Sequence, residues 1–396
     1  MLNMTNAAPP EVANWQRNAG ILGLIGLVLT ALGAVVDTQQ FYHSYLIAFT
    51  FWLGITLGCL AVVMMHNLAG GAWGAVIRRL CEAATRTLPY LGIFVLPFLF
   101  GMRYLYEWAD PQKVQADPLL LHKSPYLNVP FFWIRAVFYL LVWVGLMYYL
   151  NKWSRQQDEG YDPQIANRMS ALSAVGLVLF GLTATFGAFD WLMSLEPHWF
   201  SHIYGALLAM GGLLAAMAFV VLLIALMSRF EPMASVVSPK ILSDLGSLMF
   251  SFLFLWAYFA FSQYLLIWYA NLAEEIPWYV RRLTGGWQYV AIAIVVLSFA
   301  LPFALLISQD IKRNWKTLAA VAALMLVMRL VDLFWMVAPV WSASSLRIHW
   351  LDIVAPIGLG GAWFFLFLRE LRNRPILAPN DPKLPLPALA GHADEH

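Results

Sequence analysis

The sequence predicts an all-α integral membrane protein with ten transmembrane helices, arranged as two related four-helix bundles with one flanking helix at each end. Of the 396 residues, 61% are hydrophobic and only 12% are charged, whereas a soluble domain carries about 25% charged residues. The mean hydropathy is +0.68, and the apolar residues gather in ten long runs. We therefore expect the chain to fold in a lipid bilayer.

Each of the ten runs is long enough to cross a bilayer, which takes roughly 20 predominantly apolar residues. Lipid offers no partner to an unpaired backbone N–H or C=O group, and the runs are too long for the strands of a barrel, so we expect helices. The expected spans are 17–36, 41–65, 86–105, 129–150, 168–192, 201–227, 242–268, 287–308, 317–338 and 350–371.

The distribution of the 24 Lys and Arg residues predicts the orientation. Most of them lie at the amino terminus, in the even-numbered loops and in the carboxyl-terminal tail, and positively charged loops stay on the cytoplasmic side. Both termini are therefore expected in the cytoplasm. The first run lacks a basic leader and a small-residue cleavage site, so we expect it to be retained. The tail 372–396 is rich in proline and small residues, which predicts disorder.

A short motif that occurs twice predicts an internal repeat. Asp37–Tyr45 reads DTQQFYHSY and Glu196–Tyr204 reads EPHWFSHIY, so both fit acid-x-x-x-Phe-x-His-x-Tyr at an offset of 159 residues. The same offset carries the third and fourth spans onto the seventh and eighth, and duplicated membrane proteins often function near the interface of their repeats. The expected divisions are an amino-terminal segment (1–16), a first helix (17–36), a first bundle of spans two to five (37–195), a second bundle of spans six to nine (196–340), a closing helix (341–371) and the tail (372–396).

The usual sequence patterns for a resident metal or redox cofactor are missing. A membrane haem b needs two imidazoles at similar depth on facing helices, whereas the eight histidines lie near the ends of spans or in the tail. The two cysteines, Cys59 and Cys81, share no metal-ligand spacing, and the sequence has no Cys-x-x-Cys-His, Walker A or His-Glu-x-x-His pattern. We therefore expect this chain to bind no metal or cofactor of its own.

One outer connection concentrates groups that can exchange protons. The stretch FDWLMSLEPHWFSHIYG, Phe189–Gly205, contains Asp190, Glu196, His198 and His202 between two apolar runs. Histidine has an unperturbed pKa of about 6.5, and beside carboxylates it suits proton transfer near neutral pH. The alternative interpretation is a set of interfacial side chains satisfied by water and backbone groups.

Ionisable residues also lie inside the spans, where a charge costs about 2.5–3.5 kcal/mol on insertion scales. Arg329 and Asp332 are three residues apart in the ninth span, so both side chains share one helix face and can pair. This pair is either a structural salt bridge or a site where Asp332 titrates once a neighbouring event releases it. Arg135 lies about 9 Å inside the outer end of the fourth span, at 1.5 Å per residue.

The seventh span carries a line of hydroxyl groups toward the inner face, with Asp244 at its cytoplasmic mouth. Hydroxyl groups both donate and accept hydrogen bonds, as a proton wire requires. The alternative is that they allow close helix packing and bond to helix backbones. The line consists of Ser243, Ser247, Ser251, Tyr258 and Ser262.

Three stretches carry a resemblance to a known family. The outer connection, SDLGSLMFSFLFLWAYFAFSQYLLIWYANLAEEIPWYVRR (243–282) and RIHWLDIVAPIGLGG (347–361) resemble the ActF membrane subunits of bacterial alternative complex III. These subunits are related to the NrfD and polysulfide reductase membrane subunits. The resemblance covers essentially all ten spans. It implies two four-helix bundles with flanking helices, in a quinol:electron acceptor oxidoreductase of the respiratory chain of the bacterial inner membrane.

The resemblance also implies partners. A sister NrfD-like subunit, a multihaem cytochrome c and an iron–sulfur protein would assemble with this chain, with a terminal oxidase as an attached acceptor. Quinol, c-type haems and iron–sulfur clusters would be bound by those partners. In the sister subunits the corresponding stretch has a histidine where this sequence has Phe200, so we expect quinol oxidation in the sister subunit.

The expected function is a non-redox membrane subunit of a quinol-oxidising complex that supports proton translocation or release and anchors the outer haem and iron–sulfur subunits. Its proton path would use the outer connection, the Arg329 and Asp332 pair, and the hydroxyl line with Asp244. One alternative is direct binding of quinone or quinol by this chain at His202, Asp190 and Arg135. The other is a secondary transporter, because repeats and buried charges also occur in that class.

Overall fold

The computed structural model describes residues 8–378, 380–381 and 384. Within these residues the chain is all-α, with helices and connecting turns and no strand, so the predicted fold class is confirmed. Nine helices in the described part of the chain are long and apolar enough to cross a membrane, and one bent helix pair meets the same criterion when its two helices are taken together as one span. Residues 1–7 of the predicted amino-terminal segment, and residues 379, 382–383 and 385–396 of the predicted tail, lie outside the described residues.

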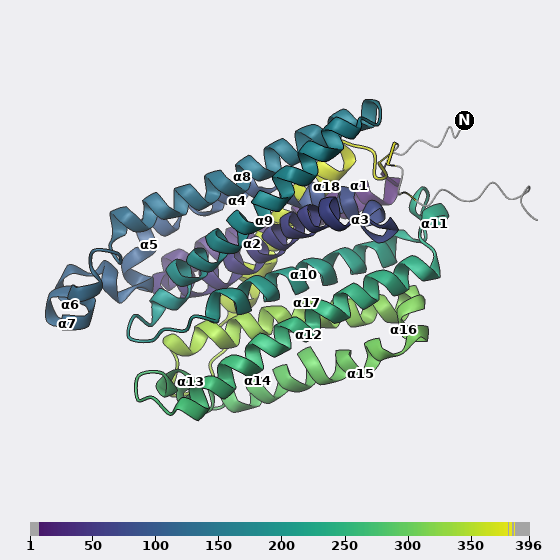
Figure 1. Ribbon diagram of the computed structural model, residues 1–396. Coiled ribbons are helices and arrows are strands. Elements are labelled where there is room, and N and C mark those ends of the chain that lie inside the picture. Colours follow the sequence, from purple (N-terminus) through teal and green to yellow (C-terminus); the bar gives the residue numbers. More distant parts are fainter. Residues whose placement is uncertain (1–7, 379, 382–383, 385–396) are drawn as a thin grey trace, which may run out of the picture.

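Most predicted spans correspond to one long helix each (Figure 1). The eighth span is α14 followed by a π-helical segment, η3, and α15. The bounds of the long helices are α1 (Pro10–Val36), α2 (Thr38–Ala69), α8 (Val129–Glu159), α9 (Pro163–Trp191), α10 (Tyr204–Met227), α12 (Pro239–Ala270), α14 (Trp287–Ala293), η3 (Ile294–Ala300), α15 (Leu301–Ile307), α17 (Trp315–Val337) and α18 (Trp350–Arg372).

The third span differs from its prediction. Helical structure begins at Ala72, well before the expected start at residue 86, and runs through α3 (Ala72–Thr85) and α4 (Leu88–Phe94). The axis then bends by 73° into α5 (Phe98–Leu105). Pro97 lies at the bend, and a proline removes a backbone donor from the helix ladder. Hydropathy missed the first half because charged side chains interrupt it.

Short elements connect the spans on both sides of the molecule. On the side of α6, α7 and α13, the first half projects a helical arm after α5 (Figure 1). These short elements are η1 (Glu107–Ala109), α6 (Pro111–Ala116), α7 (Pro118–Lys123), η2 (Met193–Leu195), α11 (Met233–Val236), α13 (Ile276–Arg282), α16 (Gln309–Arg313) and η4 (Ala338–Val340).

The helices gather in two groups with α2 and α10 at their interface. Figure 1 shows α2 to α9 on one side and α12 to α17 on the other, with α10 between them. α2 packs against α9 and α10, and α10 packs in turn against α12 and α17. Gly58 of α2 faces Gly212 of α10, and a Cβ at Gly58 would lie 2.5 Å from the Gly212 carbonyl oxygen. Because glycine has no side chain, the two central helices can approach each other closely at this point.

The first and last helices of the chain pack against each other. α1 and α18 form the most extensive helix pair in the described structure, and both also contact α2. Gly23 and Gly26 of α1 face Gly358 and Gly361 of α18. A Cβ at Gly358 would lie 2.5 Å from the backbone of Gly26. The flanking helices thus form one antiparallel pair beside the first group.

This glycine contact predicts a stability difference between two Gly→Ala substitutions. Gly358→Ala should destabilise the protein by about 1–3 kcal/mol, because the added methyl group meets backbone that cannot move aside. Gly145→Ala in α8 is the matched control, since nothing lies within 4 Å of the position that its Cβ would take; it should be neutral or stabilising, because alanine favours the helix. Unfolding of the detergent-solubilised protein by SDS, followed by tryptophan fluorescence, measures both. Equal midpoints would contradict the contact.

Candidate functional site

Asp190, at the end of α9, is held by an arginine and a tyrosine of α8. The Arg135 guanidinium donates to both carboxylate oxygens, each at 2.8 Å, and the Tyr139 hydroxyl donates to Oδ2 at 2.8 Å. Asp190 is 1% exposed. Arg135 also lies over the Tyr126 ring, with its Cζ 3.9 Å from the centroid. The structure therefore brings Asp190 and Arg135 together as a bidentate ion pair inside the first group of helices.

Glu196 is held in the same manner by the second group of helices. Its two carboxylate oxygens accept from Arg281 at 2.8 Å and from Arg282 at 2.7 Å, both in α13. Arg282 is 1% exposed and also donates to the Met336 carbonyl at 2.6 Å. Burial lowers the pKa of Arg282, and the neighbouring Glu196 opposes that shift. The sequence prediction named Glu196 but not its arginine partners.

The two ion pairs anchor the outer connection to both halves of the molecule. The first acid of this connection bonds to α8, and the second bonds to α13. Their carboxylates are occupied by arginine donors, which makes them structural acceptors in this arrangement. Tyr126, beside the first pair, has its pKa raised to about 12 by burial and by the Asp190 charge.

The two histidines of the connection have different surroundings. His198 is exposed, and its Nε2 lies 2.7 Å from Oδ2 of Asp117 in the helical arm. Although desolvation works in the opposite direction, backbone N–H groups of α7 and His198 together hold the pKa of Asp117 below its ordinary value. His202 is exposed and packs edge-on against Phe200 at 6.0 Å. No hydrogen bond or ion pair in the described structure joins His202 to Asp190 or Arg135.

Arg329 and Asp332 form a buried ion pair on one face of α17, as their spacing predicts. Arg329 Nη1 donates to Asp332 Oδ2, and the two residues are 7% and 5% exposed. The Arg329 guanidinium occupies the place that a side chain at Gly211 of α10 would fill, since a Cβ there would lie 2.1 Å from Cζ. The pair therefore lies where the two groups of helices meet.

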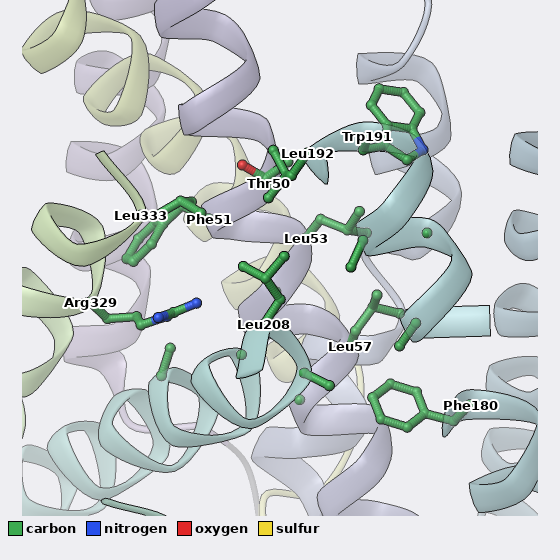
Figure 2. Close-up of a pocket in the computed structure, with 18 of the residues that line it drawn as sticks. Thr50, Phe51, Leu53, Leu57, Phe180, Trp191, Leu192, Leu208, Arg329 and Leu333 are labelled. Atoms are coloured by element: carbon green, nitrogen blue, oxygen red, sulfur yellow. The ribbon is translucent and has the colours of Figure 1, made fainter. Parts of the chain in front are cut away.

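A cavity of about 110 Å³ adjoins this pair. Residues of α2, α8, α9, α10 and α17 line it, and Figure 2 shows the Arg329 guanidinium pointing into it among apolar side chains. The Thr50 hydroxyl in its wall is already donated to the Leu46 carbonyl at 2.7 Å. Arg329 is consequently the charged group of an otherwise apolar cavity.

One part of the hydroxyl line of α12 is hydrogen-bonded to α16, and another part lies on the exposed face of the helix. At the amino-terminal end of α12 the Ser243 hydroxyl donates to Gln309 at 2.7 Å, and Ser247 accepts from Lys312 at 3.0 Å. Further along, Ser251 and Tyr258 lie on the exposed face of the helix. Ser262 is half-buried and Asp244 is exposed. No hydrogen bond in the described structure connects this line to Arg329 or Asp332.

Sequence reasoning missed a buried network at the opposite end of the molecule. Glu82 of α3 accepts from Arg78 at 2.9 Å, from Arg79 at 2.8 Å and from the Ser154 hydroxyl at 2.6 Å. Asp158 of α8 accepts from Arg79 as well. The spacing of three and four residues between these arginines and Glu82 was the available signal, but hydropathy alone assigns this charged segment to a loop.

The chain after α18 extends this network. The Asn380 amide donates to the Asp158 carbonyl at 2.9 Å, and Arg78 pairs with Asp381 at 3.3 Å. Ile376 and Leu377 are buried. The described part of the predicted tail is therefore packed against α3 and α8, while Lys383, His392 and His396 lie outside the described residues.

A hollow of about 1320 Å³ opens beside the outer connection. Its walls come from the arm of the first half, from the connection itself and from α13 of the second half. Tyr106 in its wall is buried, which raises the pKa of its hydroxyl. The charged side chains that line it are Arg103, Glu107, Lys113, Lys123, Glu196, Glu274 and Arg281.

The fold and the buried ion pairs together define an all-α membrane protein that crosses the bilayer several times. Throughout the described ranges, His, Cys, Asp and Glu side chains form no group of three or more that could hold a metal ion. No family model and no curated protein matches the chain.

The Asp190 pair predicts an asymmetric effect of two Asp→Asn substitutions. Asp190→Asn should destabilise the protein by about 3–5 kcal/mol, because it leaves Arg135 buried without its counter-charge. Asp117→Asn in the exposed arm is the matched control and should leave the unfolding midpoint unchanged, since exposed ion pairs contribute little. The midpoint in SDS or on heating measures both. Equal midpoints for the two variants would show that the buried pair has no structural role.

Proposed function

We propose that this chain is the non-redox membrane subunit of a quinol-oxidising respiratory complex of the alternative complex III type. In that complex it supports proton translocation or release and anchors haem and iron–sulfur subunits on its outer face. The observation that carries this proposal is the Arg329–Asp332 pair, buried at the interface of the two groups of helices beside a cavity. Intramembrane ionisable residues mark proton paths in many membrane proteins.

The chemistry of the pair makes proton uptake conditional. Protonation of Asp332 removes the charge that compensates Arg329 and leaves a lone guanidinium in the apolar interior, which costs about 3–5 kcal/mol for a buried pair. Asp332 therefore accepts a proton only when another group stabilises Arg329, or when the pair moves toward water. This condition suits a coupled step, in which events in a redox partner decide when the carboxylate is protonated.

The route to the cytoplasmic side would run along α12 and be completed by a second chain. Ser243 and Ser247 are already hydrogen-bonded to α16, whereas Ser251 and Tyr258 lie on the outer surface of the helix. A sister subunit packed on this face would cover both hydroxyl groups and close the gap. The same face would then serve assembly and proton transfer together.

The outer hollow supports the anchoring role. It is large, it contains both cationic and anionic side chains, and its walls join the two halves of the molecule. Interfaces between subunits combine apolar area with a polar rim, and this composition suits a docked outer protein. The ion pairs of Asp190 and Glu196 hold the floor of the hollow in place from both sides.

Purification tests the assignment to a complex. An affinity tag on this chain in its native host should recover c-type haem and an iron–sulfur protein in a fixed ratio to it, with haem visible in the reduced-minus-oxidised spectrum. Exchange of charge on the outer hollow, Lys113→Glu, should reduce the recovered haem severalfold, because it reverses an exposed charge in the proposed interface. Arg313→Glu on the opposite side is the matched control. Recovery of this chain without haem-containing partners contradicts the proposal.

Proton translocation tests the role of the buried pair. In proteoliposomes of the purified complex, the double variant Arg329→Gln with Asp332→Asn removes both charges while keeping the site neutral. It should lower the number of protons moved per electron without lowering quinol oxidation under uncoupled conditions. Asp244→Asn should slow proton uptake from the cytoplasmic side, and the exposed Asp310→Asn is its control. An unchanged proton-to-electron ratio in the double variant would remove the pair from the proposed path.

A further inference from the structure

The cavity beside Arg329 has the form of a ligand site that the proposed proton path does not use. It lies between helices of both halves and is partly open, and its walls are almost entirely apolar (Figure 2). Its volume of about 110 Å³ is similar to that of apolar cavities that hold one benzene-sized molecule. Such a space accommodates a single ring or a short stretch of chain.

The Arg329 guanidinium has hydrogen-bond donors to spare in this cavity. A guanidinium carries five N–H donors, and the structure gives Arg329 one hydrogen bond, from Nη1 to Asp332. Its remaining donors have no acceptor among the described residues, although the side chain is 7% exposed and faces the cavity. These N–H groups face the cavity instead of being closed in by protein atoms, so they can donate to an acceptor placed there. The cavity therefore suits an occupant with an oxygen acceptor.

The charge of the site restricts the kind of acceptor. Asp332 already neutralises Arg329, so a phosphate or carboxylate ligand would add an uncompensated negative charge in a medium of low dielectric constant. An uncharged carbonyl oxygen accepts from the spare donors without that cost. Water is a weaker occupant, because a buried water needs two to four polar partners and the Thr50 hydroxyl is already bonded elsewhere in the wall.

We propose that this cavity binds an uncharged, membrane-soluble molecule with an apolar body, whose carbonyl oxygen accepts hydrogen bonds from Arg329. The carbonyl belongs either to a ring, as in a substituted benzoquinone, or to an aliphatic ester. The apolar body contacts Leu208, Phe180 and Leu57 in the cavity wall. Trp191 and Leu192 of the outer connection lie in the cavity wall, but Asp190, Glu196, His198 and His202 do not line it. The site does not depend on assembly into a respiratory complex.

Four probes test the chemistry of the site on the full-length protein in detergent. A benzoquinone with a decyl chain represents the ring carbonyl, methyl palmitate represents the ester, palmitate at pH 8 supplies the charged head, and hexadecane lacks an acceptor. Calorimetric titration measures the dissociation constant of each. At least one neutral carbonyl probe should bind about tenfold or more tightly than hexadecane and palmitate, because a hydrogen bond to a charged donor contributes on that scale. The ratio between the two neutral probes identifies the kind of carbonyl.

Variants locate the binding. Leu208→Trp fills the cavity and should abolish binding of the preferred probe, whereas Leu182→Trp, on the exposed face of α9, is the matched control and should leave it unchanged. The double variant Arg329→Gln with Asp332→Asn keeps the site neutral and should bind the preferred probe at least about tenfold more weakly, with hexadecane unaffected.

Three results would overturn the proposal. One is equal binding of methyl palmitate, the quinone, palmitate and hexadecane, which would show that no acceptor is recognised. A second is unchanged binding of the preferred probe in Leu208→Trp, which would place it elsewhere. The third is the absence of binding by both neutral carbonyl probes, which would leave water as the occupant.

Discussion

The turn between α9 and α10 depends on two carboxylates, one of which accepts hydrogen bonds from the first group of helices and the other from the second. The Asp190 carboxylate accepts two hydrogen bonds from Arg135 and one from Tyr139, both in the first group of helices. Glu196 takes its bonds from Arg281 and Arg282 in the second. Because each buried guanidinium needs its carboxylate to remain neutralised, the turn fixes how the two groups meet on this side. The cavity, the Arg329–Asp332 pair and the outer hollow all lie along the interface that results.

The same rule governs the opposite end of the molecule. Glu82 gathers Arg78, Arg79 and Ser154 into one network, and the chain after α18 joins it through Asp381. The charged side chains buried among the helices here are sets of arginines paired with carboxylates. Each set joins elements far apart in the sequence, so ion pairs supply the specificity that apolar packing in lipid does not. Ion pairs thus hold the helices together at the two ends of the molecule, and close glycine contacts hold them together in its middle.

The sequence predicted the spans well because hydropathy over about 20 residues is a local property. It predicted the Arg329–Asp332 pair for a similar reason, since both residues lie on one turn of one helix. It placed the start of the third span too late, because a window that counts charges as unfavourable cannot see that Glu82 compensates Arg79. It placed Asp190 and Arg135 with His202 in one candidate quinone site but did not predict their ion pair, because 55 positions separate them in the chain. Pairing across elements requires the fold.

The cavity and the ion pair beside it are linked by the charge of Arg329. When Asp332 takes up a proton, Arg329 loses its counter-charge, and a neutral carbonyl in the cavity becomes a more important acceptor for its N–H groups. An occupant would therefore lower the cost of protonation, and by reciprocity protonation of Asp332 would strengthen the hold on the occupant. Ligand binding and proton uptake at this interface would then favour each other through one guanidinium, with no change in the fold.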